Sequence, residues 1–113
     1  MKHNMHLKEK PFNQIKNETK TIELRLNDEK RKLIKIGDLI EFSNLETNEI
    51  IDTEVINIYH YDTFEELYKN FDKISLGYNE NEEKDPNDMD EYYPKDKQLK
   101  YGVIGIKINV LKK

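Results

Sequence analysis

The chain has 113 residues, which suits one domain with a single modest core and leaves little room for two. Charged residues make up 37%, the formal net charge is −4, and the absence of cysteine excludes disulfide bonds, thiolate zinc sites and a cysteine nucleophile. Hydrophobic residues reach only 35%, but they fall into periodic runs, which indicates a folded domain with a heavily charged surface and not a disordered chain.

The first 26 residues predict a strand, a helix and a second strand. Residues 3–8 are expected to form a short strand, and residues 10–17 a short helix with an apolar pair at Phe12 and Ile15. Residues 21–26 then alternate: Ile22, Leu24 and Leu26 point to one side, and Thr21, Glu23 and Arg25 share the other.

The middle of the chain predicts two strands joined by a polar hairpin loop. Residues 27–35 form a charged connection with room for one helical turn, and a turn at 36–38 leads into a strand over 39–42. The loop 44–48 follows, and then a long strand over 49–61. Both phases of this long strand carry apolar residues, so we expect it to be covered on two sides or kinked partway.

A second helix is predicted over residues 64–71. Thr63 is placed to cap it, and Glu66 three residues later completes the sequence pattern of a capping box. A turn at 76–78 follows, in which Gly77 supplies a positive φ angle.

The last third predicts a loop, short helical turns and a closing strand. Residues 79–88 are acidic and poor in apolar residues, which is typical of a flexible loop, and residues 89–101 favour helical turns interrupted at Pro94. Residues 103–110 form the final strand, where Gly105 marks a bulge or a close backbone approach. Because most strands follow one another directly, the order favours an α+β fold with a mixed or antiparallel β-barrel flanked by short helices.

The charges are unevenly distributed along the chain. Residues 1–40 hold ten Lys or Arg against six Asp or Glu, whereas residues 79–96 are strongly acidic. A local basic face is suited to contact phosphate, and an acidic segment limits nonspecific binding. Two other interpretations stay open: a solvated surface of mixed charge, and an acidic segment that binds a basic protein.

Several stretches, taken in order, resemble the ASCH domain family of the PUA-like superfamily. They cover almost the whole chain, so we treat 1–113 as a single ASCH domain. The stretches are Lys20-Thr21-Ile22-Glu23-Leu24-Arg25, similar to K-T-I-E-x-R; Ile36-Gly37-Asp38-Leu39-Ile40-Glu41-Phe42, similar to x-G-D-x-I-x-F; Phe64-Glu65-Glu66-Leu67; Leu76-Gly77; Tyr92-Tyr93; and Tyr101-Gly102-Val103-Ile104-Gly105-Ile106.

The resemblance implies a PUA-like barrel with a cleft beside the K-T-I-E-x-R strand and a role in binding RNA or a nucleotide. Some members hydrolyse the acetyl amide of N4-acetylcytidine, and others are ribonucleases. In the amidohydrolases this strand carries a Lys and, three residues on, a Thr nucleophile; Lys20 matches the former, but Glu23 replaces the latter. A carboxylate does not replace a hydroxyl in acyl transfer. Thr21 lies about 6–7 Å away along the strand, which makes it a poor substitute.

The candidate site therefore centres on residues 20–25. For binding, Arg25 offers planar donors to phosphate or a base edge, with Thr21 and Glu23 beside it and Lys20 adding a mobile positive charge at the strand entrance. For the alternative, a hydrolase acting on RNA or a modified nucleoside, Lys20 and Glu23 form the acid/base pair. The competing interpretation is a Glu–Arg pair on the surface with little energetic weight.

Three aromatic residues near the final strand complete the predicted site. Tyr92, Tyr93 and Tyr101 are able to stack on unpaired bases, or to lie in the core with their hydroxyls at the surface.

Other sites and locations are not indicated. The three histidines do not suggest a metal site, no glycine-rich phosphate loop or G-x-S-x-G motif is present, and no cofactor is expected. No apolar run is long enough for a membrane span, and the first six residues lack the apolar stretch of a signal peptide, so we expect a cytoplasmic protein. The expected partner is RNA or a nucleotide-like molecule; the oligomeric state stays open.

Overall fold

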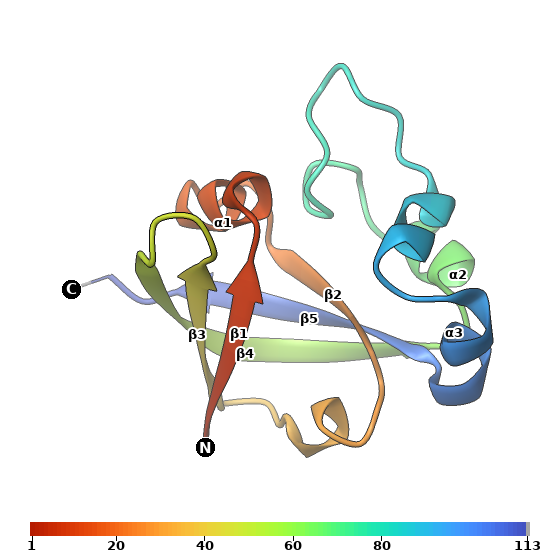
Figure 1. The fold of residues 1–113 in the computed structure, drawn as a ribbon, viewed down its shortest axis with the longest axis horizontal. Coiled ribbons are helices and arrows are strands. Elements are labelled where there is room, and N and C mark those ends of the chain that lie inside the picture. Colours follow the sequence, from red (N-terminus) through yellow and green to blue (C-terminus); the bar gives the residue numbers. More distant parts are fainter. Residues whose placement is uncertain (113) are drawn as a thin grey trace.

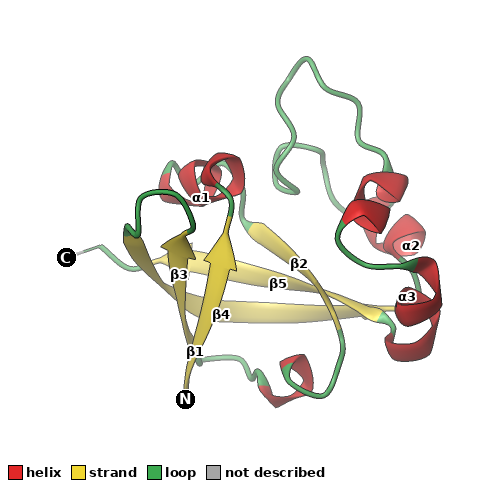
Figure 2. Ribbon diagram, in the orientation of Figure 1, coloured by secondary structure: helices red, strands yellow, loops and turns green. Residues whose placement is uncertain are grey.

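One mixed β-sheet organises the computed structural model, which describes residues 1–112 (Figure 1). Figure 2 distinguishes the strands, helices and loops. In chain order they are β1 (Lys2–Leu7), α1 (Glu9–Lys16), β2 (Ile22–Leu26), the 3-10 turn η1 (Arg31–Leu33), β3 (Leu39–Asn44), β4 (Ile50–Tyr61), α2 (Phe64–Tyr68), the 3-10 helix η2 (Pro86–Glu91), α3 (Lys95–Tyr101) and β5 (Val103–Val110).

The strand order is β1-β3-β4-β5-β2, with β1 and β2 at the two edges. The pair β1–β3 is parallel, and the other three pairs are antiparallel. The sheet curls into a half-barrel, which brings the edge strand β1 round to the same side as β2 (Figure 1). This arrangement confirms the predicted α+β fold with a mixed, barrel-like sheet and short flanking helices.

The predicted irregularities of the two long strands have clear structural counterparts. The ladder between β4 and β5 shifts register between Val55 and Asn57, which agrees with the second of the two expectations for the 49–61 strand, a kink partway along it. Gly105 lies where β5 passes close beneath its neighbours: a Cβ there would stand 3.1 Å from Ile22 Cγ2 and 3.4 Å from Leu67 Cδ1. Of the two roles predicted for Gly105, the structure therefore shows the close backbone approach. The register shift lies at Val55 and Asn57, and Gly105 is not part of it.

Helix α2 begins as predicted but is shorter than the expected range 64–71. The Thr63 hydroxyl accepts a hydrogen bond from the Glu66 N–H at 3.2 Å, as an N-cap should. The helix ends at Tyr68; beyond it, the Asn70 side chain donates at 2.9 Å to the Glu66 carbonyl, the group that the Asn70 N–H would bond to in a continued helix. The last part of the predicted 79–88 loop is also helical, since η2 begins at Pro86 behind the Asp85 cap.

Two groups of buried apolar side chains stabilise the fold. The first fills the concave side of the half-barrel beneath α1, where Phe12, Ile15, Ile40 and Phe42 are fully buried. The second lies between β2, α2 and η2, and includes Leu24, Leu67, Leu76 and Met89. In Figure 1, α2, η2 and α3 gather at one end of the β4–β5 ribbon, away from α1. None of the helices formed by residues 1–112 has the length and apolar character needed to cross a bilayer.

Candidate functional site

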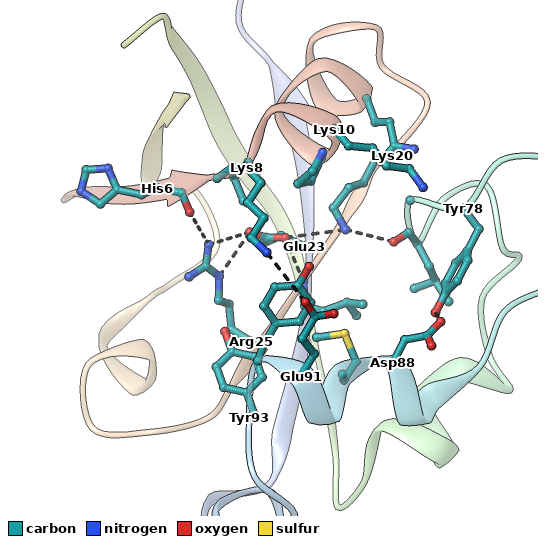
Figure 3. A pocket seen from close by; sticks show the side chains of 18 of the residues that line it. His6, Lys8, Lys10, Lys20, Glu23, Arg25, Tyr78, Asp88, Glu91 and Tyr93 are labelled. Carbon is teal, nitrogen blue, oxygen red and sulfur yellow. Dashed lines mark hydrogen bonds and ion pairs between the residues drawn. The ribbon is translucent and has the colours of Figure 1, made fainter. Parts of the chain in front are cut away.

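A cleft of about 460 Å³ lies between the two edge strands and the segment that follows α2. The end of β1 and the start of α1 line one side, β2 forms the floor, and residues 76–78 and 88–93 line the other side (Figure 3). The site is therefore placed where the half-barrel stays open, with its two walls supplied by parts of the chain that are far apart in sequence.

Three charged residues of the floor form one buried network, the floor cluster: Lys20, Glu23 and Arg25. One Glu23 oxygen, Oε2, accepts hydrogen bonds from Arg25 Nη2 at 2.8 Å and from Arg25 Nε at 3.2 Å. The other, Oε1, accepts the Leu24 N–H at 3.2 Å and lies 3.6 Å from Lys20 Nζ. The side chains of Arg25 and Glu23 are only 13% and 5% exposed, so the alternative of a Glu–Arg pair on the surface is wrong.

Lys20 is fixed in place and is not the mobile charge that the sequence suggested. Its ammonium group donates to the carbonyls of Ile22 at 2.9 Å and Leu76 at 3.0 Å. Glu23 Oε1 lies within ion-pair distance of the same nitrogen, so the three N–H groups of Lys20 all have acceptors nearby. Lys20 thus ties the turn at Gly77 to the start of β2.

The protonation states of the floor cluster follow from burial and from its own charges. Burial by itself would raise the pKa of the Glu23 carboxyl, but the charges of Arg25 and Lys20 and the hydrogen bonds from Arg25 and Leu24 outweigh it and hold that pKa below 4.5. Burial lowers the pKa of the Lys20 ammonium; Arg25 adds to this effect and Glu23 opposes it. The two shifts have opposite consequences: that of Glu23 favours its charged form, and that of Lys20 favours its neutral form.

Arg25 spans the opening of the half-barrel. Its Nε and Nη2 atoms donate to Glu23. Nη2 also lies 3.5 Å from the carbonyl of His6 on β1, the opposite edge strand (Figure 3). Tyr93 stands beside the guanidinium in the cleft. Burial raises the pKa of the Tyr93 phenol, so it stays protonated and can donate a hydrogen bond.

The walls of the cleft combine apolar and aromatic surface. Tyr93 is fixed from behind by Phe64, with the ring centroids 6.2 Å apart and the planes 20° from parallel. Tyr92 is 53% exposed, and Lys8 Nζ lies 5.4 Å from its ring centroid. Tyr78 closes the far side, where its hydroxyl donates to Asp88 Oδ2 at 2.7 Å. A flat ring therefore finds both an apolar surface and hydrogen-bonding groups within this cleft.

Two lysines form the rim, and each faces a carboxylate. Lys10 Nζ contacts both oxygens of Glu82, at 2.9 and 3.1 Å, and Lys8 Nζ lies 3.8 Å from Glu91 Oε1. Unlike the floor cluster, these side chains are largely open to solvent: 61% for Lys8 and 54% for Lys10.

Five of the seven predicted site residues line the cleft: Lys20, Glu23, Arg25, Tyr92 and Tyr93. Thr21 does not, because it precedes β2 and its backbone is bonded between Ser75 and Ile108. Tyr101 does not either: it lies at the end of α3 and packs against the second apolar group. None of the lining residues is Ser, Thr or Cys, so the part of the chain described here places no hydroxyl nucleophile of the Thr type in the cleft.

Other lining residues were missed by the sequence reasoning. The clearest are His6, Lys8, Lys10 and Tyr78, which come from the end of β1, the start of α1 and the turn after α2. The excess of basic residues in the first 40 positions was the only signal for the lysines, and it did not single out these two. Within residues 1–112, no three His, Asp or Glu side chains are grouped in a way that would hold a metal ion.

Comparison with known proteins identifies the family of the chain. Two solved structures are similar to the chain over nearly its full length. The hypothetical protein PH0355 is 31% identical with a TM-score of 0.83, over 98% of this chain and all of that one. The protein PF0455 from Pyrococcus furiosus is 33% identical with a TM-score of 0.72, over the whole of both chains. No curated protein gives a match. The family model of the ASCH domain matches residues 5–112, and the chain belongs to the ASCH domain family.

Proposed function

We propose that the cleft binds single-stranded RNA or a nucleotide-like ligand, with Arg25 as the main polar contact. The observation that carries this proposal is the floor cluster: a guanidinium held in a fixed orientation by Glu23 at the bottom of a cleft with tyrosine walls. Such a site offers directed donors to an acceptor-rich ligand without first having to order a flexible side chain.

The dimensions and walls favour an unpaired base over a duplex. Bases within a double helix are already stacked on one another, whereas an unpaired base is free to enter a cleft and stack on an aromatic side chain. Stacking of this kind contributes about 1–3 kcal/mol per base. Tyr92 and Tyr93 supply the aromatic surface, and Lys20 and Glu23 act by positioning Arg25 and the turn at Gly77.

Family membership supports the same proposal, because ASCH domains are PUA-like domains generally associated with RNA. We propose accordingly that this chain acts in RNA metabolism in the cytoplasm.

Binding of short single-stranded RNA by wild type, Arg25→Gln and Arg31→Gln tests the proposal. Arg31 is the chain's other arginine; it pairs with Asp28 at 2.9 Å and does not line the cleft, so its variant carries the same change of charge outside the site. We expect Arg25→Gln to weaken binding at least about tenfold, as loss of a charged hydrogen-bonding contact should, and Arg31→Gln to bind nearly as wild type. Equal binding by all three proteins would remove Arg25 from the site.

Hydrolysis of RNA or of a modified nucleoside is the second candidate, and one observation favours it. Lys20 Nζ and Glu23 Oε1 lie 3.6 Å apart, both side chains are buried and line the cleft, and burial lowers the pKa of Lys20. Incubation with RNA and with N4-acetylcytidine, followed by product analysis, decides between turnover and binding alone. Product formation that Glu23→Gln abolishes supports the enzyme; no turnover above that variant eliminates it.

A further inference from the structure

The Lys and Arg side chains that line the cleft, besides His6, equal the Asp and Glu side chains in number, but the two sets come from different parts of the chain. The basic ones are Lys8, Lys10, Lys20 and Arg25; the acidic ones are Glu23, Glu82, Asp88 and Glu91. Of the four acids, only Glu23 belongs to the body of the domain. The other three lie on residues 79–91, the acidic strap. Apart from the strap, the lining of the cleft holds four Lys or Arg side chains and one carboxylate, that of Glu23.

The strap places two of its carboxylates on the basic rim. Glu82 binds Lys10 through both oxygens, and Glu91 faces Lys8. In the sequence, Lys10 and Glu82 are 72 positions apart, so the pairing is a feature of the folded chain and not of a local motif.

Contacts on its other side hold the strap in this position. Lys73 Nζ donates to the carbonyls of Glu80 at 2.6 Å and Glu82 at 2.9 Å. Glu82 Oε1 also accepts the Asn79 N–H at 2.7 Å, which orients the carboxylate toward Lys10. The backbone of the strap is therefore anchored away from the rim. Both rim carboxylates reach solvent, but they differ: Glu91 is 70% exposed and weakly paired, whereas Glu82 is 36% exposed and accepts three hydrogen bonds.

We propose that Lys8 and Lys10 are the phosphate contacts of the cleft, and that Glu91 and Glu82 occupy in the free protein the positions that RNA phosphates take in the complex. This inference rests on the proposed RNA binding and adds to it the path of the ligand backbone and a competitor within the chain. An exposed carboxylate pair is easily exchanged for a phosphate, because both are anions with similar acceptor geometry toward an ammonium group.

The competition has a measurable consequence. A phosphodiester chain must displace Glu82 and Glu91 from the two lysines before its phosphates can bind there, which reduces its affinity. A ligand without phosphate does not compete with these carboxylates, so its affinity is unaffected. Neutralising both should strengthen RNA binding by roughly three- to tenfold, the effect expected for two exposed charge pairs. Removing both lysines should weaken it and reduce the slope of log affinity against log salt by about one to two, since each phosphate contact on a single strand contributes about 0.7.

The experiment compares two doubly neutralised variants that have the same net charge. Glu82→Gln/Glu91→Gln removes the strap charges. Glu49→Gln/Glu18→Gln is the matched control, because these residues pair with Lys16 at 2.6 Å and Lys112 at 2.9 Å, outside the cleft. Affinities of a labelled single-stranded RNA hexamer and of the four free nucleosides are measured for each, together with Lys8→Met/Lys10→Met and the wild type.

The expected result is tighter binding of the hexamer by the strap variant alone, unchanged nucleoside binding, and weaker hexamer binding with a smaller salt slope for the lysine variant. Equal tightening by both neutralised variants would show a general charge effect and overturn the role of the strap. No saturable binding by any of the four proteins would overturn the proposed function and this inference together. Urea unfolding of each variant checks that all are folded.

Discussion

The floor and the rim of the cleft both hold paired charges, but in opposite surroundings. In the floor cluster, Glu23 is 5% exposed and accepts three hydrogen bonds of 2.8 to 3.2 Å from Arg25 and the Leu24 N–H. On the rim, Lys8 and Glu91 are 61% and 70% exposed and lie 3.8 Å apart. A buried charge that loses its partner is costly, whereas an exposed one is rehydrated at little cost.

The difference in burial suggests that the floor cluster and the rim pairs have different roles. The floor is part of what keeps the domain folded, and it gives Arg25 a fixed orientation toward the cleft. The rim contributes little to folding, so its pairs are available for exchange with a ligand. On this account, mutations in the floor should change stability and binding together, and mutations on the rim should change binding with stability preserved.

The largest effect is expected for Glu23→Gln. This change leaves the Lys20 and Arg25 cations buried beside each other without their shared counter-ion, which should cost about 3–5 kcal/mol in the free energy of unfolding. Urea denaturation measures it, with Glu49→Gln as the exposed control. A loss no larger than that of the control would mean that the floor cluster behaves like the rim.

A smaller loss is expected for Gly77→Ala. Gly77 has φ = +103°, and an added Cβ would lie 3.1 Å from Lys20 Cδ and 3.2 Å from Gln14 Oε1. The strained backbone should cost about 1–3 kcal/mol, and the displaced Lys20 should also weaken RNA binding. Unchanged unfolding and unchanged RNA affinity would show that Lys20 and the turn do not depend on each other.

A third prediction concerns how the free energy of unfolding depends on pH below neutrality, through the ionisation of Glu23. The folded-state pKa of Glu23 lies below 4.5, so its contribution is present above that value and is lost as the pH falls through the folded pKa. Arg25 is the charge that does most to lower this pKa, so Arg25→Gln raises it. The stability difference between wild type and Arg25→Gln should therefore shrink as the pH falls from 7 to 3. Urea midpoints across that range measure it, and a constant difference would contradict the coupling.

The smallest effect is expected for Lys8→Met on the rim. Its pair with Glu91 is exposed, and surface substitutions of this kind usually change the free energy of unfolding by less than about 0.5 kcal/mol. The same variant should bind RNA less tightly than wild type. A stability loss approaching that of Glu23→Gln would remove the distinction between rim and floor.

The order of elements and the floor of the cleft followed from local sequence patterns. The alternation over 21–26 put Glu23 and Arg25 on one face, the cap at Thr63 started α2, and Gly77 has the positive φ predicted for it. Each of these features is decided within a few residues of itself, so periodicity and turn chemistry were enough to predict it.

The walls and rim depended on contacts that no local pattern contains. The pair Lys10–Glu82 joins residues 72 positions apart, and Tyr78 lines the cleft beside a turn that Lys20 holds to β2. Thr21 fits the alternation of the strand, yet it lies outside the cleft because the backbone of Ser75 binds it just before β2 begins. The depth at which Lys20 and Glu23 are buried is likewise a result of the whole fold.

The most direct test of the central claim is a titration of the labelled protein with a short single-stranded RNA, followed by the NMR shifts of its backbone amides. We expect saturable shifts that are concentrated on the cleft, at residues 6–14, 23–25, 76–78 and 88–93. Shifts that gather instead on the α2–α3 end of the domain around Lys69 and Leu99, or no saturable shifts at all, would contradict it.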